Sequence, residues 1–98
     1  MRNSFADTLA SISKKNKKIY IVVADISPAN GLNKFIKKNP DKFINVGVSE
    51  QLMIGICAGL AMRGKRPFAY TISTFSLYRP FEMIRNDICY KNLTVTIV

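Results

Sequence analysis

Glu50 is the residue whose type and position most strongly suggest chemistry. It is one of only six acidic residues, and it follows Ser49 at the start of an apolar run that is long enough for a helix. A carboxylate in the first turn of a helix usually does no more than interact favourably with the helix dipole. In a dry pocket the same group can hold a proton, or exchange one with a bound heterocycle. Glu50 is therefore the candidate catalytic residue, with the dipole interaction as the alternative.

The 98-residue chain contains no histidine. For this chain alone, that excludes a Ser-His-Asp triad, a Cys–His nucleophile and a histidine-ligated metal. Proton transfer must then use carboxylates, tyrosine, lysine or a cofactor. The two cysteines, Cys57 and Cys89, lie in apolar stretches and are not spaced as CxxC. We expect them to be small core residues of a reduced, cytoplasmic protein.

Two aromatic residues, Phe75 and Tyr78, stand three positions apart, and Ile72 stands three positions before Phe75. We expect a loop over 73–77 that leads into a helix. A triplet of this kind most often packs in the core. If it were exposed at the C-terminal end of a strand, it would form a stacking wall for a flat ring.

These candidates need a scaffold, and the hydrophobic pattern predicts one. The predicted helices cover 4–14, 31–38, 50–63 and 78–90, and the predicted strands cover 19–24, 43–46, 68–72 and 93–98. Apolar residues on both faces of a strand are typical of a covered parallel sheet. Alternating strands and helices predict an α/β fold, a parallel β-sheet with flanking helices. Ligands bind at the C-terminal ends of such strands, which here lead into 25–30, 47–51 and 73–78.

Proline and glycine mark two of the predicted helix ends. Gly64 follows the third predicted helix, where glycine commonly ends a helix. Pro80 falls in the first turn of the fourth, where its missing N–H does no harm. Gly55 and Gly59 stand four positions apart within the third helix. Their small-residue face serves either internal helix–sheet packing or a subunit interface, and both readings stay open.

The net charge of +9 comes from three lysine and arginine clusters near the predicted helix ends. Cations there complement the helix dipole and maintain solubility. The alternatives are a charged partner subunit, or binding to nucleic acid or an anionic membrane. The clusters have no interleaved aromatic residues, so we expect no nucleic-acid partner. The longest apolar stretch, 52–62, is too short to span a bilayer.

The run 43–51, Phe-Ile-Asn-Val-Gly-Val-Ser-Glu-Gln, resembles the glutamate motif of the thiamine-diphosphate-dependent transketolase family. Four further segments are similar to that family in order and spacing: 23–30 to its first strand and loop, 55–61 to its interface helix, 71–78 to its pyrimidine-pocket loop and 79–87 to the helix that follows. The resemblance implies the thiamine-diphosphate-binding fold. Residues 1–98 would then form a partial, truncated pyrimidine-binding domain. A final strand at 93–98 with no helix after it fits a piece of a longer or split enzyme.

The resemblance also implies site residues and a cofactor. In that family the motif glutamate, here Glu50, hydrogen-bonds N1′ of the aminopyrimidine of thiamine diphosphate and so promotes loss of the thiazolium C2 proton. The activated cofactor carries two-carbon ketol units between sugar or sugar-phosphate substrates. Phe75 matches the stacking aromatic residue, and Tyr78 matches another part of the pocket wall. Ile72, which we also assign to the cofactor pocket, departs from the family pattern, since transketolases proper often have an aromatic residue there. Asp25 matches an acid near the thiazolium.

The sequence departs from transketolases proper at Gln51, where they have histidine. The form Ser-Glu-Gln is closer to split transketolase-like proteins and deoxyxylulose-phosphate synthase. In this family a Gly-Asp-Gly…Asn motif on another domain holds the diphosphate and magnesium. Nothing in this chain matches that motif, so we expect no metal site here and a diphosphate-binding partner, in a dimer or hetero-oligomer.

The chain alone should then be inert. The alternatives are a non-catalytic fragment or regulatory remnant of such an enzyme, a basic nucleic-acid-binding module, and a 2-oxoacid dehydrogenase beta subunit.

Overall fold

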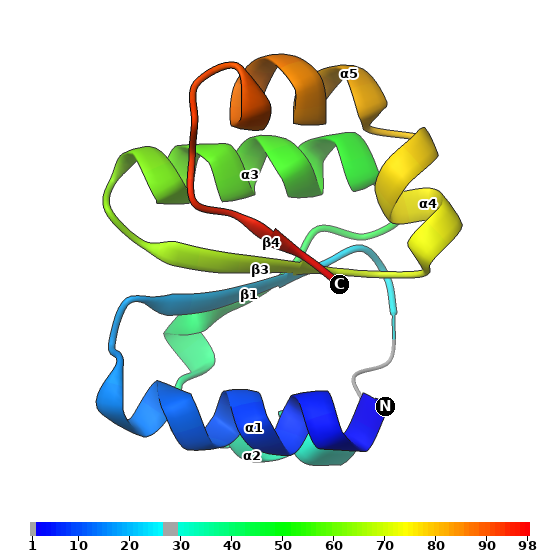
Figure 1. Cartoon of the computed structure of the whole chain (residues 1–98). Helices are drawn as coiled ribbons and strands as arrows, with labels where there is room; N and C mark the ends of the chain where they lie inside the picture. Colours follow the sequence, from blue (N-terminus) through cyan, green and yellow to red (C-terminus); the bar gives the residue numbers. More distant parts are fainter. Residues whose placement is uncertain (1, 27–29) are drawn as a thin grey trace.

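A sheet of four parallel strands forms the centre of the computed structural model, which describes residues 2–26 and 30–98 (Figure 1). The strands are β1 (Ile19–Val23), β2 (Phe43–Asn45), β3 (Arg66–Tyr70) and β4 (Thr96–Ile97), in the order β2-β1-β3-β4. The helices are α1 (Arg2–Lys15), α2 (Asn30–Lys38), α3 (Glu50–Met62), α4 (Ser73–Tyr78) and α5 (Phe81–Met83), with a 3₁₀ turn η1 (Pro40–Lys42) and a π-helix η2 (Ile84–Cys89). The predicted α/β fold with a parallel sheet and flanking helices is confirmed.

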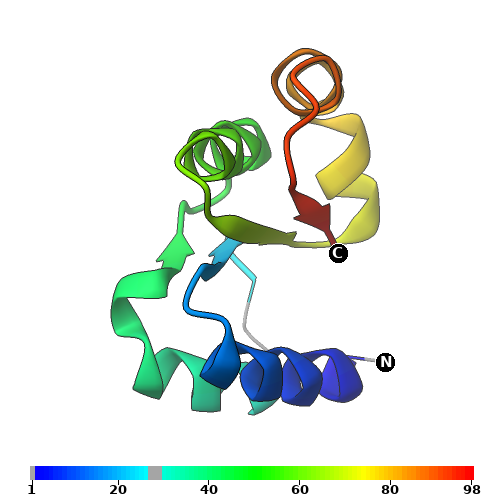
Figure 2. The same ribbon diagram turned by 60° about the vertical axis from the view of Figure 1, so that its left-hand side comes forward.

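Helices cover both faces of the sheet. Figures 1 and 2 show α1 and α2 on one side, and α3, α4 and α5 on the other. Strand β1 explains this arrangement, because its side chains alternate between two buried clusters. Ile21 packs with the residues of α1 and α2, and Val22 packs with those of α3. Four of the five residues of β1 are buried, and this removal of apolar side chains from water is the main favourable contribution to folding.

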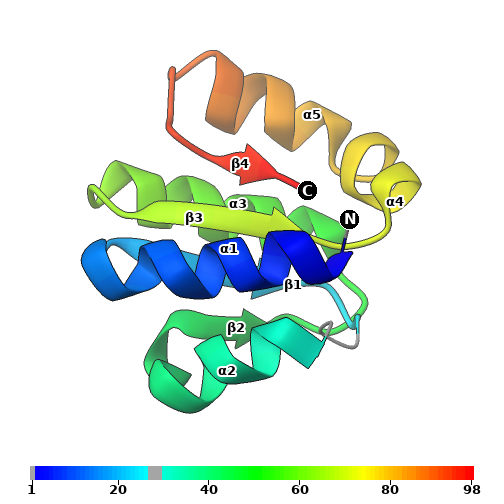
Figure 3. The ribbon, with the colours of Figure 1, turned by 60° about the horizontal axis from the view of Figure 1, so that its bottom comes forward.

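The chain adds strands to both sides of β1, so the order of strands across the sheet changes direction there. From β1 the chain passes through α2 to β2 on one side, and then through α3, on the opposite face, to β3 on the other side. Figure 3 shows the strands side by side with their arrowheads at the same end. The segments after β1 and β3 lead to helices on opposite faces of the sheet, so they diverge from each other. Open α/β sheets bind their ligands where two such segments diverge. The ends of β1 and β3 are therefore the place to look for a site.

Helix α4 corrects one prediction. Residues 73–77 were expected to be a loop, but Ser73–Tyr78 form a helix, and the backbone N–H of Phe75 donates to the carbonyl of Ile72 at 2.8 Å. The predicted helix 78–90 is correspondingly displaced. Pro80 has no N–H to continue α4, so it stands at the N-cap of α5 and not inside a first turn.

The segment after α5 is wider than an α-helix. The N–H of Tyr90 donates to the carbonyl of Arg85, five residues back, at 2.9 Å. Such π-helical turns are rare. Local hydrophobic spacing predicts a helix in this region but does not distinguish the two types.

Strand β3 begins two residues earlier than predicted, at Arg66, and includes Pro67. The N–H of Arg66 donates toward β1, so the nitrogen of Pro67 faces the opposite side. Pairing between β3 and β4 begins only at Phe68, so the missing N–H of Pro67 breaks no pair. Within β4, regular pairing covers Thr96–Ile97 only, which is shorter than the predicted 93–98.

One expected core residue, Cys89, lies at the surface. Cys89 is exposed, whereas Cys57 is buried, and both are free thiols.

Within residues 2–26 and 30–98, no helix is both long enough and apolar enough to cross a membrane.

Candidate functional site

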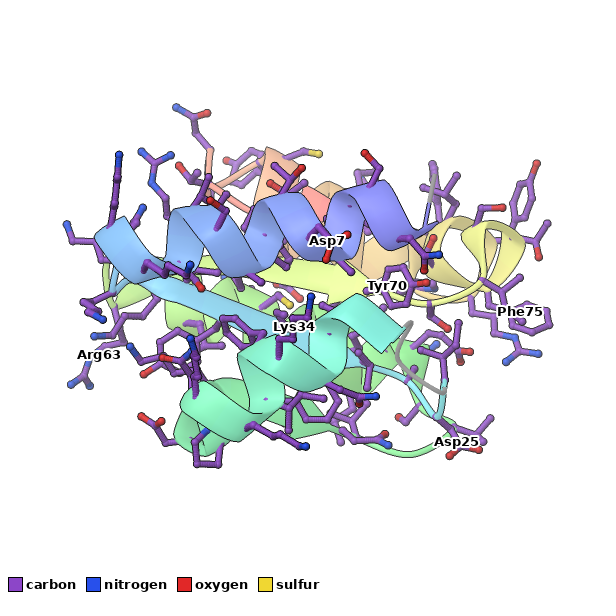
Figure 4. All side chains as sticks on the ribbon, turned by 90° about the horizontal axis from the view of Figure 1, so that it is seen from below. Asp7, Asp25, Lys34, Arg63, Tyr70 and Phe75 are labelled. Atoms are coloured by element: carbon purple, nitrogen blue, oxygen red, sulfur yellow. The ribbon has the colours of Figure 1, made fainter. Side chains whose placement is uncertain are left out.

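A cavity of about 180 Å³ lies where the ends of β1 and β3 separate. It is lined by side chains from the segments that follow β1, β2 and β3, namely Ala24, Asp25, Ile26, Val48, Glu50, Thr71, Ile72, Phe75 and Arg79. Figure 4 shows Asp25 and Phe75 at the same end of the molecule, opposite Arg63. The cavity therefore occupies the position that the strand order predicts for a ligand.

Glu50 is the buried acid of this cavity. It is the first residue of α3, and only 5% of its surface is exposed. Ser49 occupies the N-cap, and its carbonyl accepts a hydrogen bond from the N–H of Met53 at 3.0 Å, while its side chain makes no capping bond. Glu50 Oε1 accepts a hydrogen bond from Arg79 Nη1 at 2.8 Å. The buried carboxylate is thus paired with a cation, as a buried charge generally requires.

Phe75 forms the aromatic wall of the cavity. It is the third residue of α4 and is half-buried. The guanidinium carbon of Arg79 lies over its ring, 3.7 Å from the centroid. Arg79 therefore contacts both the acid and the ring, and connects the two groups that the sequence singled out.

Polar contacts hold the loops around the cavity in place. Asn45 Oδ1 accepts hydrogen bonds from the backbone N–H of Asp25 at 3.2 Å and of Gly47 at 3.0 Å. Gly47 has φ +71°, a conformation that glycine adopts without strain. Thr71 Oγ1 donates to the carbonyl of Ala24 at 3.3 Å, which links the segments that follow β1 and β3.

The structure brings four of the five predicted site residues together. Glu50, Phe75, Ile72 and Asp25 all line the same cavity. Tyr78 does not line it, and 79% of its surface is exposed. Residues 27–29 of the predicted loop 25–30 lie outside the described residues.

A second hollow of about 320 Å³ adjoins the first. It is lined by Val48, Ser49, Glu50, Gln51 and Arg79. Both hollows include Val48, Glu50 and Arg79, so the Glu50–Arg79 pair forms the boundary between them.

The most important residue that the sequence analysis missed as part of the site is Arg79. It lies 29 positions after Glu50, so helical or strand spacing does not connect them. The available signal was its place four residues after Phe75, one helical turn away. Asn45 was also missed, although a polar residue at the end of an apolar strand is typical of a loop-fixing role.

A cavity of about 280 Å³ also lies between α1 and α2. Four exposed lysines line it together with Asp7, whose carboxylate lies 3.8 Å from the ammonium of Lys34 (Figure 4). None of its lining residues comes from the ends of the strands. The cavity at Glu50 is the better candidate site because it combines a buried carboxylate with an aromatic face.

The described residues contain no group of three or more carboxylate or thiol side chains that could hold a metal ion. The polar side chains that do meet at the cavity are the carboxylates of Asp25 and Glu50, the guanidinium of Arg79 and the hydroxyl of Thr71. A carboxylate beside an aromatic face can bind a flat, nitrogen-containing ring through one hydrogen bond and stacking.

Comparison with known proteins agrees with this geometry. A family model described as "Transketolase, pyrimidine binding domain" matches residues 1–98. A Methanocaldococcus jannaschii protein named as a transketolase C-terminal section is 42% identical over 98 residues, which is all of this chain and 31% of that protein. The 1-deoxy-D-xylulose-5-phosphate synthase 1 of Geobacter sulfurreducens is 40% identical over 91 residues, which is 93% of this chain and 14% of the synthase.

A solved structure has the same fold. It is described as a split gene transketolase, inactive beta4 tetramer, and superposes with a TM-score of 0.86 at 41% identity, covering 98% of this chain and 32% of that one. This chain therefore spans about a third of these two transketolase proteins and about a seventh of the synthase. The match along the whole chain, together with the shared fold, shows that the chain belongs to the transketolase pyrimidine-binding domain family.

Proposed function

We propose that this chain is the pyrimidine-binding part of a thiamine-diphosphate-dependent, transketolase-like enzyme. The enzyme would transfer two-carbon ketol units between sugar or sugar-phosphate substrates. Residues 1–98 would form part of the pyrimidine-binding domain, and a partner domain or subunit would bind the diphosphate and magnesium. When bound, thiamine diphosphate supplies the carbon nucleophile of such a transfer.

One observation carries the proposal: Glu50 presents a buried carboxylate to a cavity that has Phe75 on its wall. A carboxylate that is shielded from water can share a proton with a ring nitrogen, and no other described acidic side chain is buried. Phe75 offers its ring for stacking, and Ile72 adds an apolar contact surface. These residues fit an aminopyrimidine.

The chain's own residues would bind, orient and shield that ring. Glu50 would hold the proton at the ring nitrogen, and Phe75 would fix the plane of the ring. Asp25, which also lines the cavity, would face the thiazolium. Tyr78 is exposed, so any contribution from it to the pocket wall would be made at the junction with the partner.

The relatives support the need for a partner. One is named as a C-terminal section of a transketolase, and another is described as an inactive β4 tetramer of a split-gene transketolase. By analogy, this chain would be inert until it meets a diphosphate-binding subunit.

Helix α3 supplies a surface that suits assembly. Its outer face exposes Leu52, Gly55, Gly59 and Met62. A Cβ built on either glycine meets nothing within 4 Å, so packing inside this chain does not require them. Glycine within a helix costs about 0.5–1 kcal/mol relative to alanine. That cost would be offset if a neighbouring subunit approaches the helix backbone closely, in a dimer or hetero-oligomer.

The test is to co-express the chain with a diphosphate-binding subunit and compare the wild type with Glu50→Gln. We expect the variant to retain most of its thiamine-diphosphate affinity, measured by calorimetry, and to lose ketol transfer and exchange of the cofactor's C2 proton, measured by NMR in D₂O. Glu82→Gln is the matched control because Glu82 is an exposed glutamate on α5. At neutral pH its thiamine-diphosphate affinity and ketol transfer should match those of the wild type.

Full turnover in Glu50→Gln would refute the role of Glu50. Ketol transfer by the wild-type chain without a partner would refute partner dependence. Cofactor binding without turnover in every reconstituted complex would favour the non-catalytic remnant.

A further inference from the structure

Arg79 makes two contacts at once that a flat nitrogen heterocycle would also make. Its Nη1 donates to Glu50 Oε1 at 2.8 Å, and its guanidinium carbon lies 3.7 Å from the centroid of the Phe75 ring. A guanidinium is planar, donates N–H groups within its plane and stacks on aromatic faces. It therefore satisfies the same acid and the same ring that would recognise an aminopyrimidine.

We propose that the side chain of Arg79 is an internal placeholder for the pyrimidine ring. In the empty site it covers the face of Phe75 and pairs with Glu50. The ring and the guanidinium then compete for the same two partners, so Arg79 swings into solvent when the ring binds. This inference rests on the proposed function, and adds to it a closed and an open form of the site.

The surroundings of Arg79 allow this motion. Its side chain is 44% exposed, so it has a direct route to solvent. Its backbone is held separately, because Gln51 Nε2 donates to the carbonyl of Arg79 at 3.4 Å. The side chain can therefore rotate while the backbone keeps its place. Once it leaves, the two hollows that share Val48, Glu50 and Arg79 become continuous.

The placeholder has a physical purpose in the empty protein. A carboxylate as buried as that of Glu50 is costly without a cation or another partner. Arg79 provides that partner and shields the exposed face of Phe75 from water. The consequence is a lower apparent affinity, since a ligand that binds only the open form loses affinity in proportion to the fraction that is open.

The experiment measures binding of 4-amino-2-methylpyrimidine to this chain by NMR, with ¹³C labels on glutamate and phenylalanine. Arg79→Ala should bind the probe about tenfold more tightly than the wild type, because a charge-assisted hydrogen bond keeps the closed form in excess. Arg79→Gln, which retains a polar side chain without the charge, provides a second variant should the alanine variant fold poorly. Arg85→Ala, which removes an exposed arginine paired with Glu82, should match the wild type.

A second binding experiment uses free guanidinium ion, well below denaturing concentrations, as a ligand that resembles the arginine side chain and not the pyrimidine. It should bind Arg79→Ala, shift the Glu50 and Phe75 signals, and be displaced by the probe. In the Arg79→Ala background, adding Glu50→Gln or Phe75→Leu should weaken binding of both compounds.

The outcomes separate the two proposals. Equal or weaker probe binding in Arg79→Ala, still dependent on Glu50 and Phe75, would overturn the placeholder and leave the proposed function standing. Probe binding that is independent of Glu50 and Phe75 would overturn both. Guanidinium binding without any probe binding would also overturn both, and would leave the Glu50–Arg79 pair as a structural contact.

Discussion

The side-chain carbonyl of Asn45 accepts a hydrogen bond from the backbone N–H of Asp25, with a nitrogen–oxygen distance of 3.2 Å. Asp25 has φ 44°, in the left-handed region that residues other than glycine adopt at some energetic cost. The same oxygen of Asn45 also accepts from Gly47, in the turn that leads to Glu50. One side chain at the end of β2 therefore fixes two of the segments that border the candidate site.

Replacing Asn45 by alanine should remove both hydrogen bonds. We expect the free energy of unfolding to fall by about 1–2 kcal/mol and the amide of Asp25 to exchange faster with solvent. Urea denaturation and hydrogen exchange measure the two effects. Asn33→Ala removes an exposed asparagine from α2 and is the control. An unchanged exchange rate at Asp25 in Asn45→Ala would contradict this role.

The double variant Gly55→Ala/Gly59→Ala should act in opposite directions on folding and on assembly. Both glycines face open space, so alanine should stabilise the isolated chain by about 0.5–1 kcal/mol at each position. The added methyl groups should weaken any association through the outer face of α3. Thermal unfolding and sedimentation velocity, with and without the partner subunit, measure the two quantities. Undiminished association would mean that this face lies outside the interface.

The two thiols should react at very different rates. Burial raises the pKa of Cys57 to about 12, so that at pH 8 only about one thiol in ten thousand is a thiolate. Cys89 is exposed. A disulfide reagent such as DTNB should therefore label one thiol in the folded chain and two in urea. Cys89→Ser should abolish labelling of the folded chain, and rapid labelling of that variant would show that Cys57 is accessible.

Glu82 should contribute to the acid sensitivity of the fold. Side-chain hydrogen bonds from Arg85 and then Asn86, aided by the charge of Arg85, lower the pKa of Glu82 from its ordinary value of 4.5. A lowered pKa means that the folded chain retains the carboxylate charge where the unfolded chain has begun to take up a proton. The stabilisation is therefore present above about pH 4.5 and is lost as the pH falls further.

Glu82→Gln should flatten the loss of stability below that pH, and the urea midpoint measured from pH 3 to 7 tests this. Asp41→Asn, which removes an exposed negative charge elsewhere, is the control. Identical pH profiles for Glu82→Gln and the wild type would show that the Glu82 contacts do not stabilise the fold.

Local pattern was sufficient for the central elements. Strand β1 was predicted to within one residue because apolar, mostly β-branched residues occupy both of its faces, which is typical of a strand covered on both sides. Helix α3 was predicted to begin at Glu50 and to be followed by Gly64, which indeed has φ +72°. The position of Glu50 at a strand-to-helix turn then follows from the chain order.

Other parts of the site depend on contacts between distant residues. Helix α4 has only six residues, which is too few for a clear hydrophobic period, so it was predicted as a loop. The pairing of Glu50 with Arg79 joins two helix ends and has no signature in local spacing. Tyr78 was predicted as part of the pocket wall because it is close to Phe75 in sequence, but its side chain is exposed. Local spacing does not determine which of two nearby aromatic residues faces the cavity.

Helices α2 and α4, which follow β1 and β3, lie on opposite faces of the sheet, and this has a consequence for how such a protein can change. The hollow lies where the backbone leaves the ends of β1 and β3 toward opposite faces, so its location is set by the course of the backbone. Substitutions at Ile72 or Asp25, which line the hollow, can therefore alter which ligand binds while the location of the binding site stays the same. Recognition can diversify among descendants of this chain without any redesign of the scaffold.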